Sequence, residues 1–179
     1  MKNVLICVFV FVALSIGQAF AYNATDFSTD TKIIAALNLL QQSGDYDVFT
    51  NMQKNAVKIK FYNLGMSNVY ATNSYDSYGR RVILINSIYK NAPVEQIACL
   101  IAHESCHTAR RATMEEETTA TQKEASCWTR LKRNVAYPET KLTKRLDKLA
   151  DLYLASDSDT NYIHEKIASS TFYRTQFGM

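Results

Sequence analysis

The amino-acid sequence predicts an α+β fold, in which a small, mostly antiparallel sheet packs on one helix and several further helices follow. Three observations lead to this prediction. Apolar residues recur at helical spacing in several segments, other short segments have the alternation or composition of strands, and one strand leads through a short loop into a helix. Residues 22–179 suffice for a single domain with one hydrophobic core.

Residues 1–21 have the three parts of a signal peptide. Lys2 supplies positive charge, residues 4–16 form an apolar stretch, and Ala19 and Ala21 are small residues at the cleavage positions. We expect cleavage after Ala21 and a secreted or periplasmic mature protein, without stable membrane association. A retained N-terminal anchor is the alternative, although the apolar stretch is shorter than the roughly 20 residues that a membrane span needs.

The mature chain is expected to begin with two helices. Residues 28–44 predict the first, because Thr29 or Asp30 can cap its start and Gly44 can end it. Its apolar stripe consists of Ile33, Leu37 and Leu40. A shorter helix is expected over residues 47–54.

Strands are expected next. Residues 57–61 alternate between polar and apolar side chains, residues 68–72 are a weaker candidate, and residues 81–86 are rich in β-branched side chains. The polar, glycine-containing stretch 73–80 predicts a hairpin-like turn before the last of these strands.

A helix is expected to follow the strand at 81–86 after a short loop. Pro93 suits a first helical position, and Glu95 suits a first turn. Further helices are expected near residues 114–134, 139–156 and 160–175. Pro138 and the polar run 156–159 separate them.

The helix expected after the strand at 81–86 carries an H-E-x-x-H motif over residues 103–107. Residues four apart lie nearly above one another on a helix, so His103 and His107 can reach one metal ion. Zinc lowers the pKa of a bound water molecule to about 7, and Glu104 is placed to take its proton. We therefore predict a catalytic Zn²⁺ site well inside a helix. A chance pairing of two histidines is the alternative.

With this motif after a strand, the chain resembles the zincin metallopeptidases over roughly residues 57 to 130. In zincins this helix packs against a small sheet whose edge strand holds an extended substrate. The chain departs from the metzincin pattern, because Arg110 replaces its glycine and Thr113 its last histidine. It is similar instead to gluzincin-like families, in which a glutamate of an E-x-x-A pattern on the next helix is the third ligand.

The resemblance makes Glu117 the expected third ligand, since Glu117 and Ala120 match the E-x-x-A pattern. Glu116 is the alternative ligand, whereas Glu115 is expected to face solvent or to help the helix begin. Thr121 stands where a thermolysin-type pattern has an acidic residue that orients a histidine, so no such partner is assigned. The helical face expected to point inward carries positions 117, 120, 121, 124 and 128.

The resemblance also implies a distal side chain that stabilises an oxyanion, for which His164, Tyr162 and Tyr173 are candidates. A surface or helix-terminal position of His164 is the alternative.

Three cysteines follow the predicted leader. Cys99 and Cys106 lie about 10.5 Å apart along one helix, which is beyond disulfide reach. Any bridge must therefore involve Cys127, and Cys99 is its better partner if the next helix folds back on the motif helix. Three buried thiols are the alternative. Cys106 is a poor zinc ligand, because it projects differently from both histidines.

The formal net charge of +3 at pH 7 leaves no basic footprint for nucleic acid or an anionic membrane. The features together predict a secreted zinc-dependent peptidase acting on a peptide or protein, with His103, His107 and Glu117 as zinc ligands. Glu104 would act as general base and proton shuttle. Two other classes stay open: a non-catalytic zincin-fold binding protein, and a zinc hydrolase of a non-peptide amide such as a cell-wall bond.

Overall fold

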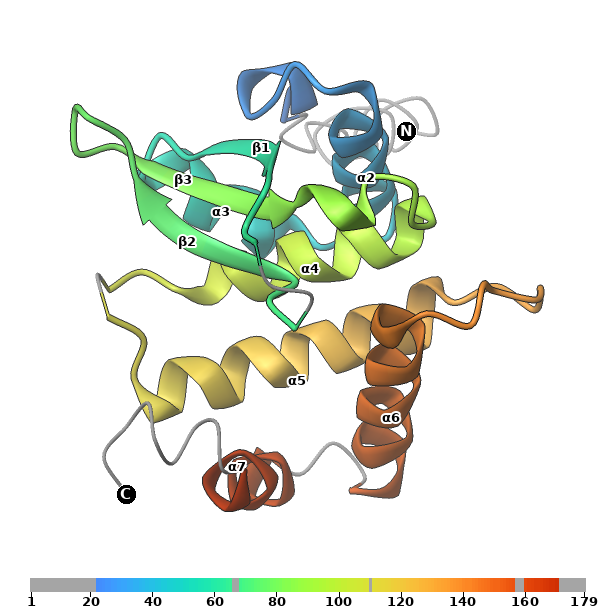
Figure 1. Ribbon diagram of the computed structural model, residues 1–179. Helices are drawn as coiled ribbons and strands as arrows, with labels where there is room; N and C mark the ends of the chain where they lie inside the picture. Colours follow the sequence, from blue (N-terminus) through green and yellow to red (C-terminus); the bar gives the residue numbers. More distant parts are fainter. Residues whose placement is uncertain (1–21, 66–67, 110, 157–159, 171–179) are drawn as a thin grey trace, which may run out of the picture.

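The computed structural model describes residues 22–65, 68–109, 111–156 and 160–170, and the predicted signal peptide lies outside them. The fold is α+β, as predicted (Figure 1). In chain order the elements are η1 (Ala24–Asp26), α2 (Thr31–Gln42), α3 (Tyr46–Lys54), β1 (Lys58–Tyr62), β2 (Ala71–Tyr75), β3 (Arg81–Asn86), η2 (Ser87–Tyr89), α4 (Val94–Cys106), α5 (Met114–Leu131), α6 (Lys141–Ala155) and α7 (Thr160–Ser169).

The three strands form a mixed sheet in the order β1-β3-β2. β1 runs parallel to β3, and β2 runs antiparallel to it, so the prediction of a mostly antiparallel sheet was wrong. β3 takes the central position because its apolar side chains are buried almost throughout, whereas β1 alternates between buried and exposed residues. β2 is left at an edge of the sheet beside the motif helix α4.

β2 lies three residues later than the sequence predicts, because its pairing with β3 determines its position. Ala71 pairs with Ile85 and Tyr75 with Arg81, so Asn73 belongs to the strand and not to the turn. The turn is shorter than expected. Asp76 closes it, since one carboxylate oxygen accepts from the backbone N–H of both Tyr78 and Arg80.

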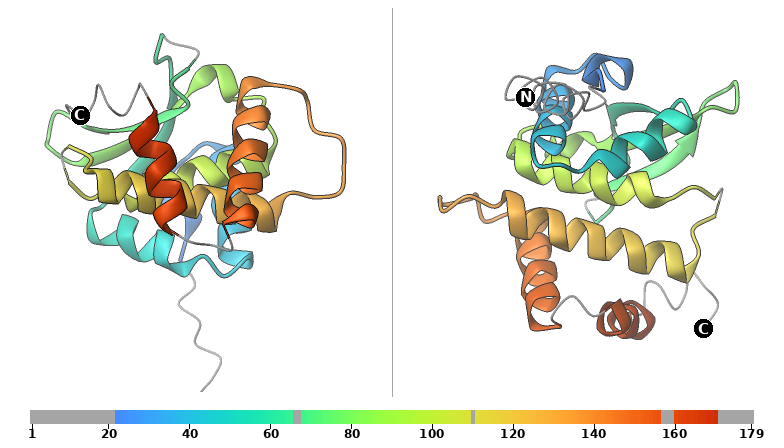
Figure 2. Two further views of the ribbon diagram at one scale, coloured as in Figure 1. Left: turned by 90° about the horizontal axis from the view of Figure 1, so that it is seen from below. Right: turned by 180° about the vertical axis from the view of Figure 1, so that it is seen from behind.

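The motif helix α4 forms the centre of the molecule and is buried from Glu95 to Ser105. The sheet, α2 and α3 lie on one side of α4, and α5 lies on the other (Figure 1). α6 and α7 then cover the far side of α5 (Figure 2). A helix that is apolar nearly all round must be covered on every side, which explains why α4 became the central element.

Helix α4 ends earlier than predicted, within the motif itself. Its last residue is Cys106, and His107 is the C-cap with an extended backbone (φ −74°, ψ 117°). The prediction that the motif sits well inside a helix was therefore wrong: the motif forms the last turn. The main-chain oxygen of Glu104 accepts hydrogen bonds from the side chains of Asn73 and Arg81, while the N–H of Thr108 donates to Glu116.

Two of the three cysteines lie side by side between α4 and α5. The Sγ atoms of Cys99 and Cys127 are 3.2 Å apart, and both residues are fully buried as free thiols. Cys106 is half-buried, and its Sγ lies 3.5 Å from the carbonyl oxygen of Ala102. The preferred pair from the sequence is thus adjacent in space, without a bridge between the two sulfurs.

Within the described residues, no helix combines the length and the apolar character that crossing a membrane requires.

Candidate metal centre

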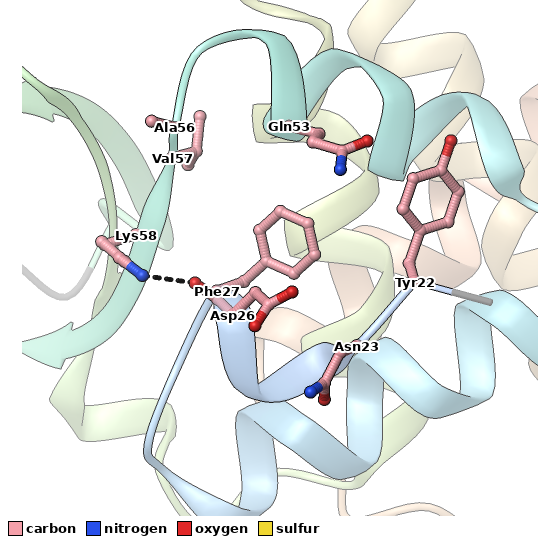
Figure 3. A pocket seen from close by; sticks show the side chains of 8 residues that line it. All are labelled: Tyr22, Asn23, Asp26, Phe27, Gln53, Ala56, Val57 and Lys58. Atoms are coloured by element: carbon pink, nitrogen blue, oxygen red, sulfur yellow. Dashed lines mark hydrogen bonds between the residues drawn. The ribbon is translucent and has the colours of Figure 1, made fainter. Parts of the chain in front are cut away.

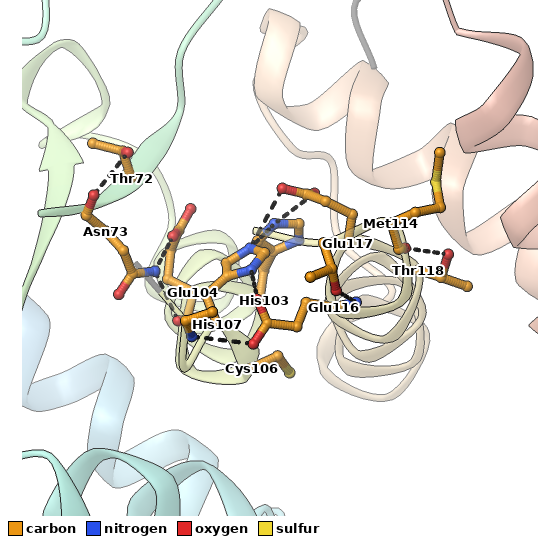
Figure 4. Close-up of polar contacts among 12 residues, drawn as sticks. Thr72, Asn73, His103, Glu104, Cys106, His107, Met114, Glu116, Glu117 and Thr118 are labelled. Atoms are coloured by element: carbon orange, nitrogen blue, oxygen red, sulfur yellow. Dashed lines mark hydrogen bonds and ion pairs between the residues drawn. The ribbon is translucent and has the colours of Figure 1, made fainter. Parts of the chain in front are cut away.

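The two motif histidines and one glutamate of α5 converge between α4 and α5 (Figure 4). The Nε2 atoms of His103 and His107 are 3.3 Å apart. Glu117 contributes both carboxylate oxygens, with Oε2 at 3.8 Å from the Nε2 of His103 and Oε1 at 3.7 Å from the Nε2 of His107. All three side chains are buried, and one ligand atom from each lies within 4.8 Å of the other two.

These spacings fit a single small metal ion. In a tetrahedral site with metal–nitrogen bonds of about 2.0–2.1 Å, neighbouring ligand atoms lie about 3.3 Å apart. The two imidazole nitrogens already have this separation, and each carboxylate oxygen of Glu117 lies within 4 Å of one of them, so the carboxylate would move inward to bind the same ion. Two imidazoles and one carboxylate are also a donor set that divalent transition metals accept. The group could therefore hold a metal ion.

The carboxylate of Glu124 contacts His103 at the ring nitrogen that does not face Glu117. Oε2 of Glu124 lies 3.0 Å from the Nδ1 of His103, and Glu124 is fully buried. Arg145 of α6 donates from Nε and Nη2 to the two oxygens of Glu124, at 3.1 and 2.6 Å. A carboxylate on the second ring nitrogen orients a ligating histidine and leaves Nε2 for the metal.

The electrostatics of this pair agree with its geometry. Burial would raise the pKa of Glu124, but Arg145 and His103 outweigh burial and lower it to about 2. Burial would likewise lower the pKa of His103, yet the contact with Glu124 raises it above its ordinary value. The carboxylate is therefore ionised at neutral pH, so it can hold the imidazole in one orientation.

Glu124 was not recognised as a histidine partner from the sequence. The expected place was Thr121, four residues after Glu117, whereas the partner lies seven residues after it, two helical turns along the same inward face. The inward face was visible in the sequence. The matching cation, Arg145, comes from another helix and left no signal there.

Glu116 takes a different role from Glu117. Its Oε1 accepts hydrogen bonds from the N–H groups of Thr108 and Ala109 and from the hydroxyl of Thr108. Oε2 lies 3.9 Å from the Nδ1 of His107, on the side of the ring away from Glu117. Glu116 therefore anchors the loop that follows α4, while Glu115 is exposed in the first turn of α5.

His107 is suited to metal binding in its neutral form. Burial and the neighbouring His103 lower its pKa to about 4. A metal competes only with protons for the imidazole lone pair, so a low pKa leaves that lone pair available at neutral pH. Cys106, by contrast, stays a thiol, because burial raises its pKa to about 11. This agrees with the prediction that Cys106 is a poor zinc ligand.

Glu104 lies beside the two histidines and is held by β2. Its Oε2 accepts a hydrogen bond of 2.5 Å from the Nδ2 of Asn73, and its main-chain oxygen accepts another of 2.9 Å from the same nitrogen (Figure 4). Burial raises the pKa of Glu104 above its ordinary value, and Glu117 adds to this, against the opposing effects of His103 and Asn73. Neither Asn73 nor its partner Arg81 was singled out in the sequence.

Of the candidates for a distal oxyanion partner, the two that the structure describes, His164 and Tyr162, lie on α7. His164 lies on α7, is exposed, and contacts the hydroxyl of Thr118 through Nδ1 at 3.2 Å. Tyr162 is half-buried, with Lys166 over its ring. Tyr173 lies outside the described residues. Thr118 follows Glu117 directly, so His164 is the candidate that contacts the ligand-bearing turn of α5.

Among the cavities that the described residues line, two differ in their relation to this site. One, of about 410 Å³, lies between η1, the end of α3 and the start of β1, and contains none of the residues described above (Figure 3). The other, of about 560 Å³, lies between α5, α6 and α7 and is lined by Thr121, Arg145 and apolar residues such as Leu149 and Ile163. Only the second shares a residue, Arg145, with the candidate metal centre.

No protein-family model, curated protein or solved structure matches this chain.

Proposed function

We propose that the protein is a zinc-dependent peptidase of the gluzincin-like zincin type, acting outside the cytoplasm on a peptide or protein. One observation carries the proposal: three buried donors from His103, His107 and Glu117 converge within 4.8 Å, and the buried carboxylate of Glu104 interacts electrostatically with His103 and Glu117 (Figure 4). A site for a structural metal has no need of a further ionisable carboxylate at this position, whereas hydrolysis requires one.

Zinc is proposed because of the donor set. Two histidines and one carboxylate are a ligand set of catalytic zinc, and three protein ligands leave one position of a tetrahedral ion open. When bound, the ion would polarise a substrate carbonyl and increase the acidity of water next to it.

Residues of the chain would transfer the proton and hold the ligands in position. The Glu104 carboxylate would take the proton from the attacking water and pass it to the leaving amine. Glu124 and Arg145 would keep the His103 ring in position, and the burial of the site would strengthen each of these charge interactions.

The proposal is tested with Glu104→Gln, which keeps the size of the side chain but cannot accept the proton. We expect the purified variant to bind one zinc ion per chain, as the wild type does, while cleavage of casein or of a peptide library falls by at least about 100-fold. Glu115→Gln, at an exposed position of the next helix, is the matched control and should cleave normally.

Three results would contradict parts of this proposal. Undiminished cleavage by Glu104→Gln would reject Glu104 as the base. A zinc ion closed by four protein ligands would indicate a binding protein instead of an enzyme. A wild-type protein that leaves every peptide intact but releases fragments from a cell-wall digest would assign it to hydrolases of non-peptide amides.

A further inference from the structure

We propose that Asn73 and Arg81 are positioning residues that hold the Glu104 carboxylate in a single orientation. The inference has a catalytic part, that this orientation speeds the reaction, and a conformational part, that Asn73 and Arg81 hold the carboxylate in place. The catalytic part rests on the proposed function, whereas the conformational part does not. Both residues belong to the sheet, on β2 and β3, so the sheet would control the side chain that acts as the base on α4.

Asn73 binds Glu104 at two points with one nitrogen. Its Nδ2 donates to Oε2 at 2.5 Å and to the main-chain oxygen at 2.9 Å. An amide nitrogen carries two hydrogens, one for each acceptor. Because one acceptor belongs to the backbone and the other to the side chain of the same residue, rotation of the Glu104 side chain relative to its helix is restricted.

Arg81 determines which way the Asn73 amide faces. Its Nε donates to the Oδ1 of Asn73 at 2.6 Å, and a guanidinium group has donors only. If the amide were turned over, two donors would face each other at Arg81 and two acceptors would face each other at Glu104. The observed orientation is therefore the one that satisfies both neighbours.

Arg81 is itself fixed at the end of the motif helix. It is only 4% exposed, and its Nη2 donates to the main-chain oxygen of Glu104 at 2.7 Å. The carbonyl groups of the last helical turn have no backbone partners and form the negative end of the helix dipole, where a cation is stabilised. Arg81 thus caps α4 and orients Asn73 at the same time.

This arrangement has a consequence for the proton transfer. Asn73 occupies Oε2 of Glu104, so Oε1 is the oxygen that stays available for a proton. A carboxylate held in this way needs no reorientation when water reacts, and a misplacement of about 1 Å can lower the rate by about 100-fold.

The test uses Asn73→Asp, which has nearly the same shape and still accepts from Arg81. It places an oxygen, and not an NH₂ group, against Oε2 of Glu104. We expect kcat to fall by about 10–100-fold, with KM changed by less than about 2-fold and one zinc ion still bound. Asn63→Asp is the control, because the exposed Asn63 accepts from Gly65 and aspartate can do the same. A kcat for Asn73→Asp within about 2-fold of the control would reject the catalytic part.

A second measurement does not depend on activity. The ¹H–¹⁵N spectra of the wild type and of Glu104→Gln are compared. We expect the side-chain NH₂ signals of Asn73 to shift between the two spectra more than those of any other side-chain amide of the wild type. Unmoved signals would show that the contact is absent and would overturn the whole inference. If the wild type cleaves no peptide while these signals move, the conformational part stands and the proposed function fails.

Discussion

At the scale of single residues, the adjacent glutamates Glu116 and Glu117 differ in what their carboxylates contact. Glu117 faces both histidine Nε2 atoms, whereas Glu116 accepts hydrogen bonds from the loop at Thr108 and Ala109. Neighbouring positions on a helix point about 100° apart, so only one of the two can face the histidines. The sequence left both as candidates, with Glu117 preferred because of its E-x-x-A pattern.

This difference predicts unequal metal binding by the two alanine variants. Glu117→Ala should lower zinc affinity by more than about 100-fold, since one of three donors is removed. Glu116→Ala should keep its zinc and lose about 1 kcal/mol of stability, because the loop N–H groups lose their acceptor. Competition with a coloured chelator measures the affinity, and thermal unfolding measures the stability. If Glu116→Ala lost zinc and Glu117→Ala kept it, the third ligand would be Glu116 and not Glu117.

At the scale of elements, the ligand-bearing helix α5 is tied to α3 through Asp45, the N-cap residue of α3. Asp45 is only 3% exposed and contacts Lys123 at 2.9 Å and Arg130 at 2.6 Å, two residues of α5. Burial would raise the pKa of Asp45, but Ser43, Lys123 and Arg130 outweigh burial and lower it below 3.8. This contact joins α5, the helix that carries Glu117, to the start of α3.

The lowered pKa of Asp45 predicts a pH-dependent contribution to stability. Because the folded-state pKa lies below the unfolded value of about 3.8, the contribution is complete above that value and disappears as the pH falls through the folded pKa. Asp45→Asn should therefore cost about 1–3 kcal/mol near neutral pH, and the difference from wild type should shrink below about pH 4. Urea unfolding at several pH values measures this.

Asp47→Asn is the control for this prediction. Asp47 also pairs with Lys123, at 2.8 Å, but its side chain is 62% exposed, and such ion pairs contribute little. A pH-independent difference between Asp45→Asn and wild type would contradict the ionic origin of the effect.

At the scale of the whole molecule, the candidate ligands come from two helices joined by a loop. His103 lies in the last turn of α4, His107 is the C-cap of that helix, and Glu117 lies in the first turn of α5, so bound metal would link the α4 layer to the α5, α6 and α7 layer (Figure 2). An unfolded chain does not hold these three side chains together. Metal binding should therefore favour the folded state.

This linkage predicts a rise in thermal stability. At free zinc about 100 times the dissociation constant, the folded state gains about 2.7 kcal/mol, which corresponds to an increase in Tm of about 5–10 °C for a chain of this size. Scanning calorimetry with zinc and with a chelator measures the difference. His103→Ala should show no increase. An equal increase in that variant would indicate zinc binding elsewhere.

Much of the fold was predictable from local patterns. Helices α2, α3, α5 and α6, the start of α4 and β3 were expected within a few residues of where they lie, because caps, breaks and apolar periodicity act over a few neighbouring positions. Helix α7 ends at Ser169, earlier than the predicted residue 175, and residues 171–175 lie outside the described part of the chain. The errors have a common origin. The position of β2, the mixed sheet and the early end of α4 all depend on partners from other elements.

The sequence alone determined which residue types could meet a metal: a spacing of four on a helix places His103 and His107 one above the other whatever surrounds them. Only the tertiary structure decided which residues orient the side chains around these histidines. Asn73 and Arg81 meet Glu104 across 31 and 23 residues of chain, and Arg145 meets Glu124 across 21. Such contacts arise from the packing of whole elements, which no local pattern specifies, so the geometry of the site could be described only after the helices and sheet were in place.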